Sequence, residues 1–344
     1  MLKNIVIVGA GPAGSYAAQL AAEKGMNVRV FEAKKKVLPA KCGEGIWKKK
    51  LVDSGINPED SYPLTKLKTL KLGIEDAGKV EYTYIDIDEY FVLNRQKFEQ
   101  SMIDNAKKNG AQFEFQTRLK NLDKISNDFF IGAYGITNFQ NIPAPELVVT
   151  YQFDVENVDI EMAKTVIFST SPYVRYIYVF PKGKHSANVG IVGPNPNPVE
   201  CKQELIKFMK SEKGLEKPTI DWEFSKPGST GLPRLQYNNN KMLLIGDAGG
   251  FCDAFSTGGI GFGLLSAKRA IESIEEKNPA KAFYEKNSEL VKKLEKSYYA
   301  ANWFYFHPER VKKLFGEAKK IENEERKAWT ISTIFERAFP NFKK

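Results

Sequence analysis

The sequence predicts an α/β fold in which a parallel β-sheet lies between layers of helices, and three observations support this prediction. Residues 5–8 (IVIV) form a short aliphatic, mostly β-branched run that is typical of a buried parallel strand. Residues 15–24 are rich in alanine, have helical spacing and are followed by Gly25, a common residue after the last turn of a helix. A second strand is predicted at residues 28–31 (VRVF), ending at Glu32.

The turn between the first strand and the first helix has the sequence GAGPAG. Gly9 permits the tight turn, Gly11 lets the backbone approach a pyrophosphate, and Gly14 lets the helix pack closely on the strand. The free N–H groups and the dipole of a helix N-terminus attract phosphates. Pro12 and Ala13 therefore join the three glycines as predicted cofactor-binding residues.

Glu32 lies about 20 residues beyond this turn, where a carboxylate accepts hydrogen bonds from ribose hydroxyls. A carboxylate there disfavours a 2′-phosphate. The site, with Ala33 beside Glu32, is therefore predicted to take FAD or NAD(H) rather than NADP(H). The alternative is a Gly-rich strand–helix turn that binds no ligand.

The composition is that of a globular protein with one large domain or two interleaved domains. The sequence contains no run of about 18 apolar residues, so it predicts no transmembrane helix. The first apolar stretch is too short for a signal peptide, so we expect a cytoplasmic location. Three cysteines without a CxxC motif and only two histidines argue against a disulfide framework, a zinc ribbon or a His-based metal site, and we predict no metal.

The chain carries 51 Lys and Arg against 42 Asp and Glu, a net charge of +9. Such a charge favours a solvated basic surface, an anionic membrane surface, acidic substrates or nucleic acid. Because the lysines are scattered in short clusters, we favour the solvated surface. We predict no nucleic-acid partner and leave a peripheral membrane contact open.

Apolar patterning predicts further strands and helices along the chain. Helices are expected at residues 47–55, 98–109, 200–213 and 264–277, and the segment 279–344 is expected to be helical throughout. Strands are expected at residues 67–72, 80–87, 91–95, 111–115, 129–135, 147–156, 165–169, 173–180, 186–192, 220–225 and 242–245.

Two further glycine-rich segments carry polar side chains. The first, KCGEG, places Cys42 beside Lys41, which is able to lower the pKa of the thiol, although a small buried cysteine is the simpler interpretation. In the second, Asp247 follows a buried strand, where its carboxylate is able to hydrogen-bond a ribityl or ribose hydroxyl. A helix that starts near Gly259 directs its N–H groups at a flavin or a pyrophosphate. The alternative for Asp247 is a turn that caps a helix.

Five segments, in this order, resemble the geranylgeranyl reductase family of FAD-dependent oxidoreductases, within the larger group with the p-hydroxybenzoate hydroxylase-like fold. They are GAGPAG, KCGEGI, LNR, YIYVFPKG and IGDAGG…STGGIG. The resemblance covers about residues 1–275. The first and last motifs are shared by the whole group, whereas the Cys-Gly-x-Gly loop and the aromatic strand before Phe-Pro are more specific.

The resemblance implies a Rossmann-like, three-layer FAD-binding domain interleaved with an antiparallel β-sheet substrate domain and followed by a helical C-terminus. We expect the FAD-binding domain to comprise residues 1–66, 92–140 and 227–278. The substrate domain is expected at residues 67–91 and 141–226, and the helical region at 279–344.

The resemblance also implies roles for individual residues. The glycine motif and Glu32 hold the ADP half of FAD, Arg95 and Asp247 hold its ribityl–pyrophosphate region, and the aromatic strand lines a prenyl pocket. The predicted catalytic residues are Cys42 and Glu44. The predicted cofactor-binding residues are Gly9, Gly11, Pro12, Ala13, Gly14, Glu32, Ala33, Lys41, Cys42, Gly43, Arg95, Gly246, Asp247, Gly258, Gly259 and Ile260. The predicted substrate-binding residues are Tyr176, Tyr178, Phe180 and Pro181.

Members of this family saturate C=C bonds of geranylgeranyl chains, in ether lipids or prenyl diphosphates, with a hydride from reduced flavin and a proton. An isolated alkene offers no polar handle, so binding requires a long apolar pocket. Cys42, Glu44 and a bound water all remain candidates for the proton donor. Since only one GxGxxG follows a strand, we expect the electrons to come from transiently bound NAD(P)H or a reduced carrier protein.

This chain departs from the family pattern at several positions. Tyr178 stands where the family has Trp, Tyr134 replaces an Asp, and Ala254 replaces a Pro. The strands before residue 129 are shortened. Two other functions therefore stay open: a flavin monooxygenase or halogenase of the same fold, and a non-catalytic binder of a lipid or pigment, which the missing Asp keeps in view.

Overall fold

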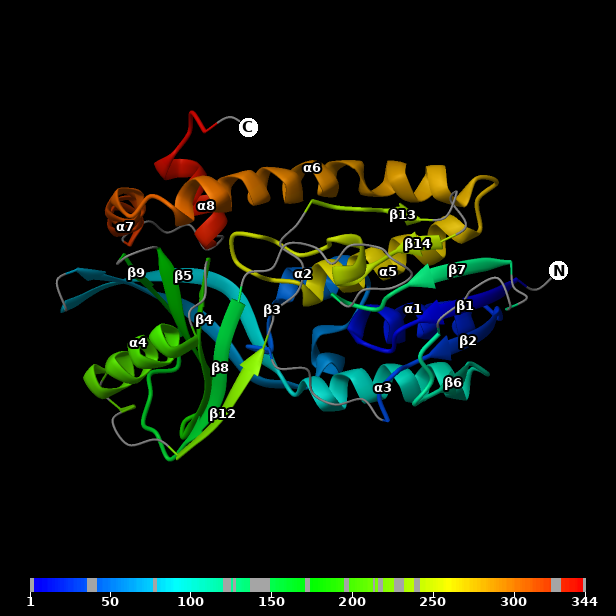
Figure 1. The fold of residues 1–344 in the computed structure, drawn as a ribbon, viewed down its shortest axis with the longest axis horizontal. Helices are drawn as coiled ribbons and strands as arrows, with labels where there is room; N and C mark the ends of the chain where they lie inside the picture. Colours follow the sequence, from blue (N-terminus) through cyan, green and yellow to red (C-terminus); the bar gives the residue numbers. More distant parts are fainter. Residues whose placement is uncertain are drawn as a thin grey trace.

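The computed structural model describes residues 3–35, 42–76, 79–119, 125, 128–136, 149–170, 174–194, 198–212, 214–215, 219–225, 232–237, 242–322 and 329–342. Two β-sheets lie side by side, and a long helix, α6 (Pro279–Tyr305), runs along both of them (Figure 1). The first turn of α6 is capped by Asn278, whose side chain accepts a hydrogen bond from Lys281 N at 3.1 Å.

The smaller sheet confirms the predicted parallel core. Its strand order is β13-β14-β7-β1-β2-β6, and only the short β13 runs antiparallel to its neighbour. The strands are β1 (Asn4–Val8), β2 (Asn27–Phe31), β6 (Gln112–Glu114), β7 (Phe129–Gly132), β13 (Gln236–Tyr237) and β14 (Met242–Leu244).

Helices cover this sheet because their small residues permit close packing. Helix α1 (Pro12–Glu23) lies between α3 (Arg95–Lys108) and α5 (Ile260–Ile274) and buries a row of alanines. Helix α5 begins at Ile260, as the motif predicted for a helix that starts near Gly259, and four residues before the start at residue 264 that apolar patterning predicted. Gly261 and Gly263 allow this early start, since a Cβ at Gly261 would lie 2.6 Å from Lys50 Cβ. The helix N-terminus is thereby brought to the carboxyl end of the parallel strands.

The larger sheet has the order β12-β8-β11-β10-β9-β4-β5-β3, antiparallel except for the parallel pair β4 and β9. The strands are β3 (Gly45–Trp47), β4 (Pro63–Asp76), β5 (Lys79–Leu93), β8 (Val149–Glu156), β9 (Lys164–Ser169), β10 (Arg175–Gly183), β11 (Ser186–Gly193) and β12 (Thr219–Ser225).

Two predicted segments next to each other differ from the structure in their bounds. The strands predicted at 67–72 and 80–87, and the segment 91–95 predicted to end a strand, all belong to one long hairpin, β4 and β5, whose register shifts at two bulges. The helix predicted from residue 47 begins at Lys48, as α2 (Lys48–Ser54), because Gly45–Trp47 pairs with β5 as strand β3. Helix α2 ends at Gly55, which has a φ of +84°.

The two faces of the larger sheet are covered differently. Helix α4 (Pro198–Ser211) packs on one face through Leu205 and Phe208, against Ile167, Ile177 and Val179 of the sheet. The opposite face meets the C-terminal end of α6, together with α7 (Glu309–Ile321) and α8 (Ile331–Ala338) (Figure 1). Two 3₁₀ turns, Pro58–Ser61 and Gly246–Gly249, complete the described elements.

Within the described residues, no helix is both long enough and apolar enough to cross a membrane. The chain passes between the two sheets four times, because β1–β2, β6–β7 and β13–β14 belong to the smaller sheet and β3–β5 and β8–β12 to the larger one. We keep the predicted division into domains as a proposal, with the observation that β3 and the first residues of β4 belong to the larger sheet.

Candidate active site

A cavity of about 1140 Å³ extends from the glycine motif of β1 to the aromatic face of the larger sheet. This exceeds the usual size of a pocket for a drug-sized ligand. The predicted site residues that line it are Gly9, Gly11, Pro12, Ala13, Glu32, Ala33, Cys42, Gly43, Glu44, Arg95, Tyr176, Tyr178, Phe180, Gly246, Asp247, Gly258, Gly259 and Ile260.

Two glycines of the motif differ in the space around their Cα atoms: Gly14 is tightly packed, and Gly11 borders empty space. Gly9 has a φ of +105°, and a Cβ on Gly14 would lie 2.0 Å from Gly9 O, so Gly14 serves close packing and does not line the cavity. A Cβ on Gly11 would meet nothing within 4 Å and faces the cavity. This open space at the start of α1 fits a pyrophosphate.

Glu32 is fixed at the edge of the cavity by backbone donors. Its Oε2 accepts a hydrogen bond from Ala10 N at 2.7 Å, and its Oε1 accepts one from Lys34 N at 2.8 Å. The carboxylate is therefore held beside the glycine turn, as a ribose-binding group requires.

Arg95 and Asp247 lie deeper in the cavity. Arg95 is buried and donates from Nε to Glu99 Oε1 at 2.7 Å. Burial opposes the charge of Arg95, but Glu99 and Cys42 favour it, and its pKa is raised overall. Burial raises the pKa of Asp247 to about 6, against the effect of Arg95. A carboxylate in this setting fits donor hydroxyls such as those of a ribityl chain.

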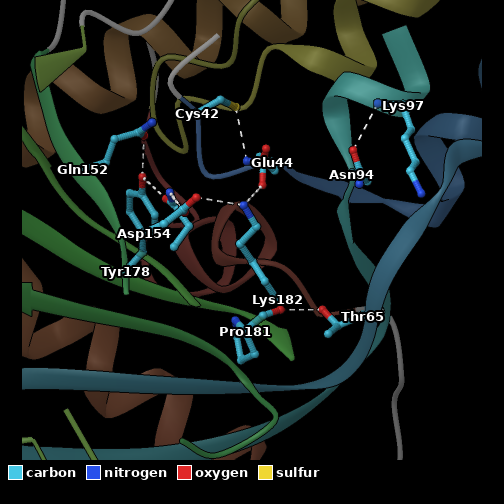
Figure 2. Close-up of polar contacts among 11 residues, drawn as sticks. Cys42, Glu44, Thr65, Asn94, Lys97, Gln152, Asp154, Tyr178, Pro181 and Lys182 are labelled. Atoms are coloured by element: carbon cyan, nitrogen blue, oxygen red, sulfur yellow. Dashed lines mark hydrogen bonds and ion pairs between the residues drawn. The ribbon is translucent and has the colours of Figure 1, made fainter. Parts of the chain in front are cut away.

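The loop that carries both predicted catalytic residues packs against β10 (Figure 2). Cys42 Sγ accepts a hydrogen bond from Glu44 N at 3.3 Å. Glu44 has a φ of +59°, unusual for a residue other than glycine. A Cβ on Gly43 would lie 2.9 Å from the Phe180 ring, so only glycine lets the loop lie this close to the aromatic strand.

Glu44 is tied to the larger sheet by ion pairs. Its Oε2 lies 2.7 Å from Lys182 Nζ, which also lies 3.0 Å from Asp154 Oδ2 (Figure 2). Burial raises the pKa of Glu44 and Lys182 lowers it, with a net rise. Since the side chain of Asp154 is 53% exposed, this series of charged groups connects the cavity with solvent.

The predicted aromatic residues form one wall of the cavity. Tyr176, Tyr178 and Phe180 alternate along β10 and face the same side. The rings of Tyr178 and Phe180 stack with centroids 4.5 Å apart. The Tyr178 hydroxyl lies 2.8 Å from Gln152 Oε1 and also within hydrogen-bond distance of Asn188. The Tyr178 hydroxyl is therefore hydrogen-bonded within the protein, and the wall offers ring faces to the cavity.

Besides Gly14, one other described residue of the predicted site does not line the cavity. Pro181 lies outside it, and its carbonyl accepts a hydrogen bond from Thr65 Oγ1 at 2.6 Å (Figure 2). The alternation that directs Phe180 into the cavity turns Pro181 away from it. Lys41 lies outside the described residues.

Sequence reasoning missed several residues of the lining. Phe168, Phe255 and Trp329 extend the aromatic wall, and Lys164 faces the cavity from β9. The alternation in the segment KTVIFS, which puts Lys164, Val166 and Phe168 on one face, was the available signal. Their position opposite Tyr176, Tyr178 and Phe180 depends on strand register, which the sequence does not show.

Comparisons with known proteins agree with this architecture. A family model described as pyridine nucleotide-disulphide oxidoreductase matches residues 3–144. Digeranylgeranylglycerophospholipid reductase 1 of Methanosphaera stadtmanae is 28% identical, over 84% of this chain and 81% of that protein. The reductase of the same name from Picrophilus torridus is 26% identical over 88% and 86%.

Among solved structures, a geranylgeranyl bacteriochlorophyll reductase-like protein from Thermoplasma acidophilum superposes with a TM-score of 0.79, at 21% identity, over 99% of this chain and 98% of that one. The chain is an FAD-dependent oxidoreductase, and it is similar to these reductases over most of its length. The fold is shared more widely, since the flavin-dependent brominase Bmp2 superposes with a TM-score of 0.65 at 16% identity, over 99% and 98%.

The observed residues fit FAD. The open space at Gly11 and the anchored Glu32 suit its ADP half, and the Asp247 carboxylate suits its ribityl hydroxyls. Gly258, Gly259 and Ile260 bring the N-terminus of α5 to the same cavity, opposite the loop of Cys42. These assignments of single residues are proposals, whereas FAD is the cofactor.

Proposed function

We propose that this oxidoreductase saturates isolated C=C bonds in the geranylgeranyl or other prenyl chain of an isoprenoid ether lipid or a prenyl diphosphate. The observation that supports this most is the aromatic wall of β9 and β10, which continues the cavity directly beyond the Cys42–Glu44 loop. The names of the relatives from Methanosphaera and Picrophilus support the same class of substrate.

A prenyl chain binds through its hydrocarbon surface. Val166, Phe168, Val192 and Phe255 extend the wall formed by the predicted tyrosines. Each buried methylene contributes about 0.8 kcal/mol, so a chain of several isoprene units binds without polar contacts. The rings orient the chain, and their apolar faces exclude water from the reacting carbons.

FAD, when bound, supplies the hydride that adds to one carbon of the double bond. The other carbon takes a proton, for which we propose Cys42 and Glu44 as donors. Of the two, Glu44 has the clearer route for regaining a proton from solvent, because Lys182 and Asp154 connect it with the surface. Two electrons per double bond come from an external donor, NAD(P)H or a reduced carrier protein. We further propose that a lipid substrate is taken up by peripheral contact with a membrane.

The test is an anaerobic reaction with mass analysis. Holoenzyme reduced with dithionite is mixed with geranylgeranyl diphosphate or with an unsaturated archaeal-type ether lipid. The proposal predicts flavin reoxidation and a gain of two hydrogens per double bond in the product. Reoxidation that requires oxygen, with a hydroxylated or halogenated product, would contradict it and favour the monooxygenase or halogenase alternative.

A further inference from the structure

Lys164 is the first residue of β9 and is only 7% exposed. Its side chain shares a face with Val166 and Phe168 and lines the cavity. The register of β9 and β10 places Val166 opposite Tyr178, so Lys164 stands next to Phe180 across the strands. A buried lysine therefore interrupts an otherwise apolar wall.

Aromatic rings surround the ammonium group. Lys164 Nζ lies 4.1 Å from the centroid of the Tyr90 ring and 4.5 Å from that of Trp47. Burial lowers the pKa of Lys164 to about 7, while Asp253 raises it slightly. Asp253 is otherwise engaged, because its Oδ1 accepts hydrogen bonds from Phe255 N and Ser256 N. The rings provide the only strong favourable contacts of this cation among the described residues.

The other buried cations of the described chain have carboxylate partners. Lys71 lies 2.8 Å from Glu212, Arg175 lies 2.8 Å from Glu204, and Arg95 is paired with Glu99. Lys164 has no ion pair with any described residue. A purely structural role would be met by an apolar residue at lower cost, because an unpaired buried charge is unfavourable. The remaining explanation is a partner that arrives with the substrate.

We propose that Lys164, framed by Trp47 and Tyr90, binds the phosphate or diphosphate head of the prenyl substrate. This rests on the proposed function and specifies its substrate as a prenyl-chain molecule with a phosphate or diphosphate head. An ammonium group offers three donors to phosphate oxygens and gains charge stabilisation that the empty subsite lacks.

The position of the subsite suits an amphipathic molecule. Trp47 beside Lys164 is only half-buried, and the exposed residues Lys49 and Asp88 line the same cavity, so a head group bound there is able to lie near solvent. From Lys164 to Phe168 the strand rises by about 13 Å, along which the chain is able to extend over the aromatic wall.

The test measures binding rather than turnover. Oxidised holoenzyme is titrated with geranylgeranyl diphosphate, a digeranylgeranylglycerol phosphate, the neutral alcohol geranylgeraniol and inorganic pyrophosphate, with the flavin absorption spectrum as the readout. Lys164→Met is compared with wild type and with Lys207→Met, which removes the same charge from the exposed surface of α4. Lys164→Arg tests whether a charge alone restores binding.

We expect Lys164→Met to weaken binding of geranylgeranyl diphosphate and of digeranylgeranylglycerol phosphate by about tenfold or more. Binding of geranylgeraniol should stay within about twofold. A loss for the diphosphate alone would assign the subsite to diphosphates, and an equal loss for both would assign it to phosphate in general. Equal effects on the ester and the alcohol, or an effect on inorganic pyrophosphate only, would overturn the proposal. If the selective loss holds but no alkene is reduced, the subsite stands and the reductase function fails.

Discussion

The two faces of the eight-stranded sheet hold buried lysines in contrasting surroundings. On the face covered by α4, Lys71 lies over the Tyr82 ring, at 4.2 Å from its centroid, and is neutralised by Glu212. On the cavity face, Lys164 lies over the Tyr90 ring at 4.1 Å and has no carboxylate partner among the described residues. The two lysines lie at nearly the same distance from a tyrosine ring, so their surroundings differ in the carboxylate partner, which only Lys71 has among the described residues.

This contrast shows how one sheet serves two purposes. On the α4 face, aliphatic residues from both elements fill the core and the charged groups pair within the protein. On the cavity face, rings and one lysine are exposed to a space that the protein itself does not fill. A change on the first face should therefore reduce stability, and a change on the second should reduce binding or activity.

The largest effect is expected at the glycine motif, where the same contrast occurs between two neighbouring positions. Gly11→Val should fold but lose FAD, because the new side chain occupies the space for the pyrophosphate. Flavin stoichiometry after purification measures this. Gly14→Val should not fold, because its Cβ would lie 2.0 Å from Gly9 O. Gly316→Val, in α7 with open space around it, is the control that should keep flavin.

Cys42→Ala should lower alkene reduction by about 100-fold or more while FAD and thermal stability are retained, because a cavity-facing thiol contributes to chemistry rather than packing. Single-turnover rates under anaerobic conditions measure this. Cys201→Ala removes a buried thiol from the α4 face and should leave the rate unchanged. Equal rates in both variants would remove Cys42 from the mechanism.

Glu212→Gln should show the opposite phenotype. It deprives Lys71 of its closest anion and weakens the bond with the Tyr82 hydroxyl, so we expect a loss of about 2–3 kcal/mol in the free energy of unfolding. Activity per folded molecule should stay within about twofold. Glu161→Gln, which removes the more distant and half-exposed partner of Lys71, is the control with a smaller expected loss. A strong effect of Glu212→Gln on activity would break the separation of the two faces.

Lys164→Met should raise stability by about 1–3 kcal/mol at pH 7 in the absence of substrate. Folding lowers the pKa of Lys164 from 10.5 to about 7, so the unfolded chain binds the proton more tightly between these values. The wild type therefore gains stability as the pH rises through this range, and the advantage of the variant should be full near pH 7 and disappear toward pH 10.5. Denaturant unfolding at several pH values measures this; an advantage independent of pH would mean that Lys164 carries no buried charge.

Local sequence patterns predicted the fold around the glycine motif well. The β1–α1–β2 unit, the cavity-facing Gly11 and the anchored Glu32 follow from spacing within some thirty residues, where strand, turn and helix preferences agree. The alternation of Tyr176, Tyr178 and Phe180 likewise predicted a common face.

What the sequence did not predict depends on contacts between distant segments. Strand β3 exists only because β5 pairs with it. Lys164 precedes the strand predicted at residues 165–169, and only the register of β9 with β10 places it in the wall. Pro181 was included with the aromatic residues although strand alternation turns it away.

The most direct test of this account is to map a bound prenyl chain onto the two faces of the sheet. A geranylgeranyl diphosphate with a photoreactive group on its chain is bound to the holoenzyme and cross-linked, and the labelled peptides are identified by mass spectrometry. The account predicts labels on Phe168, Tyr176 or Tyr178, displaced by unlabelled substrate. Labels on α4, or labels that substrate does not displace, would contradict it.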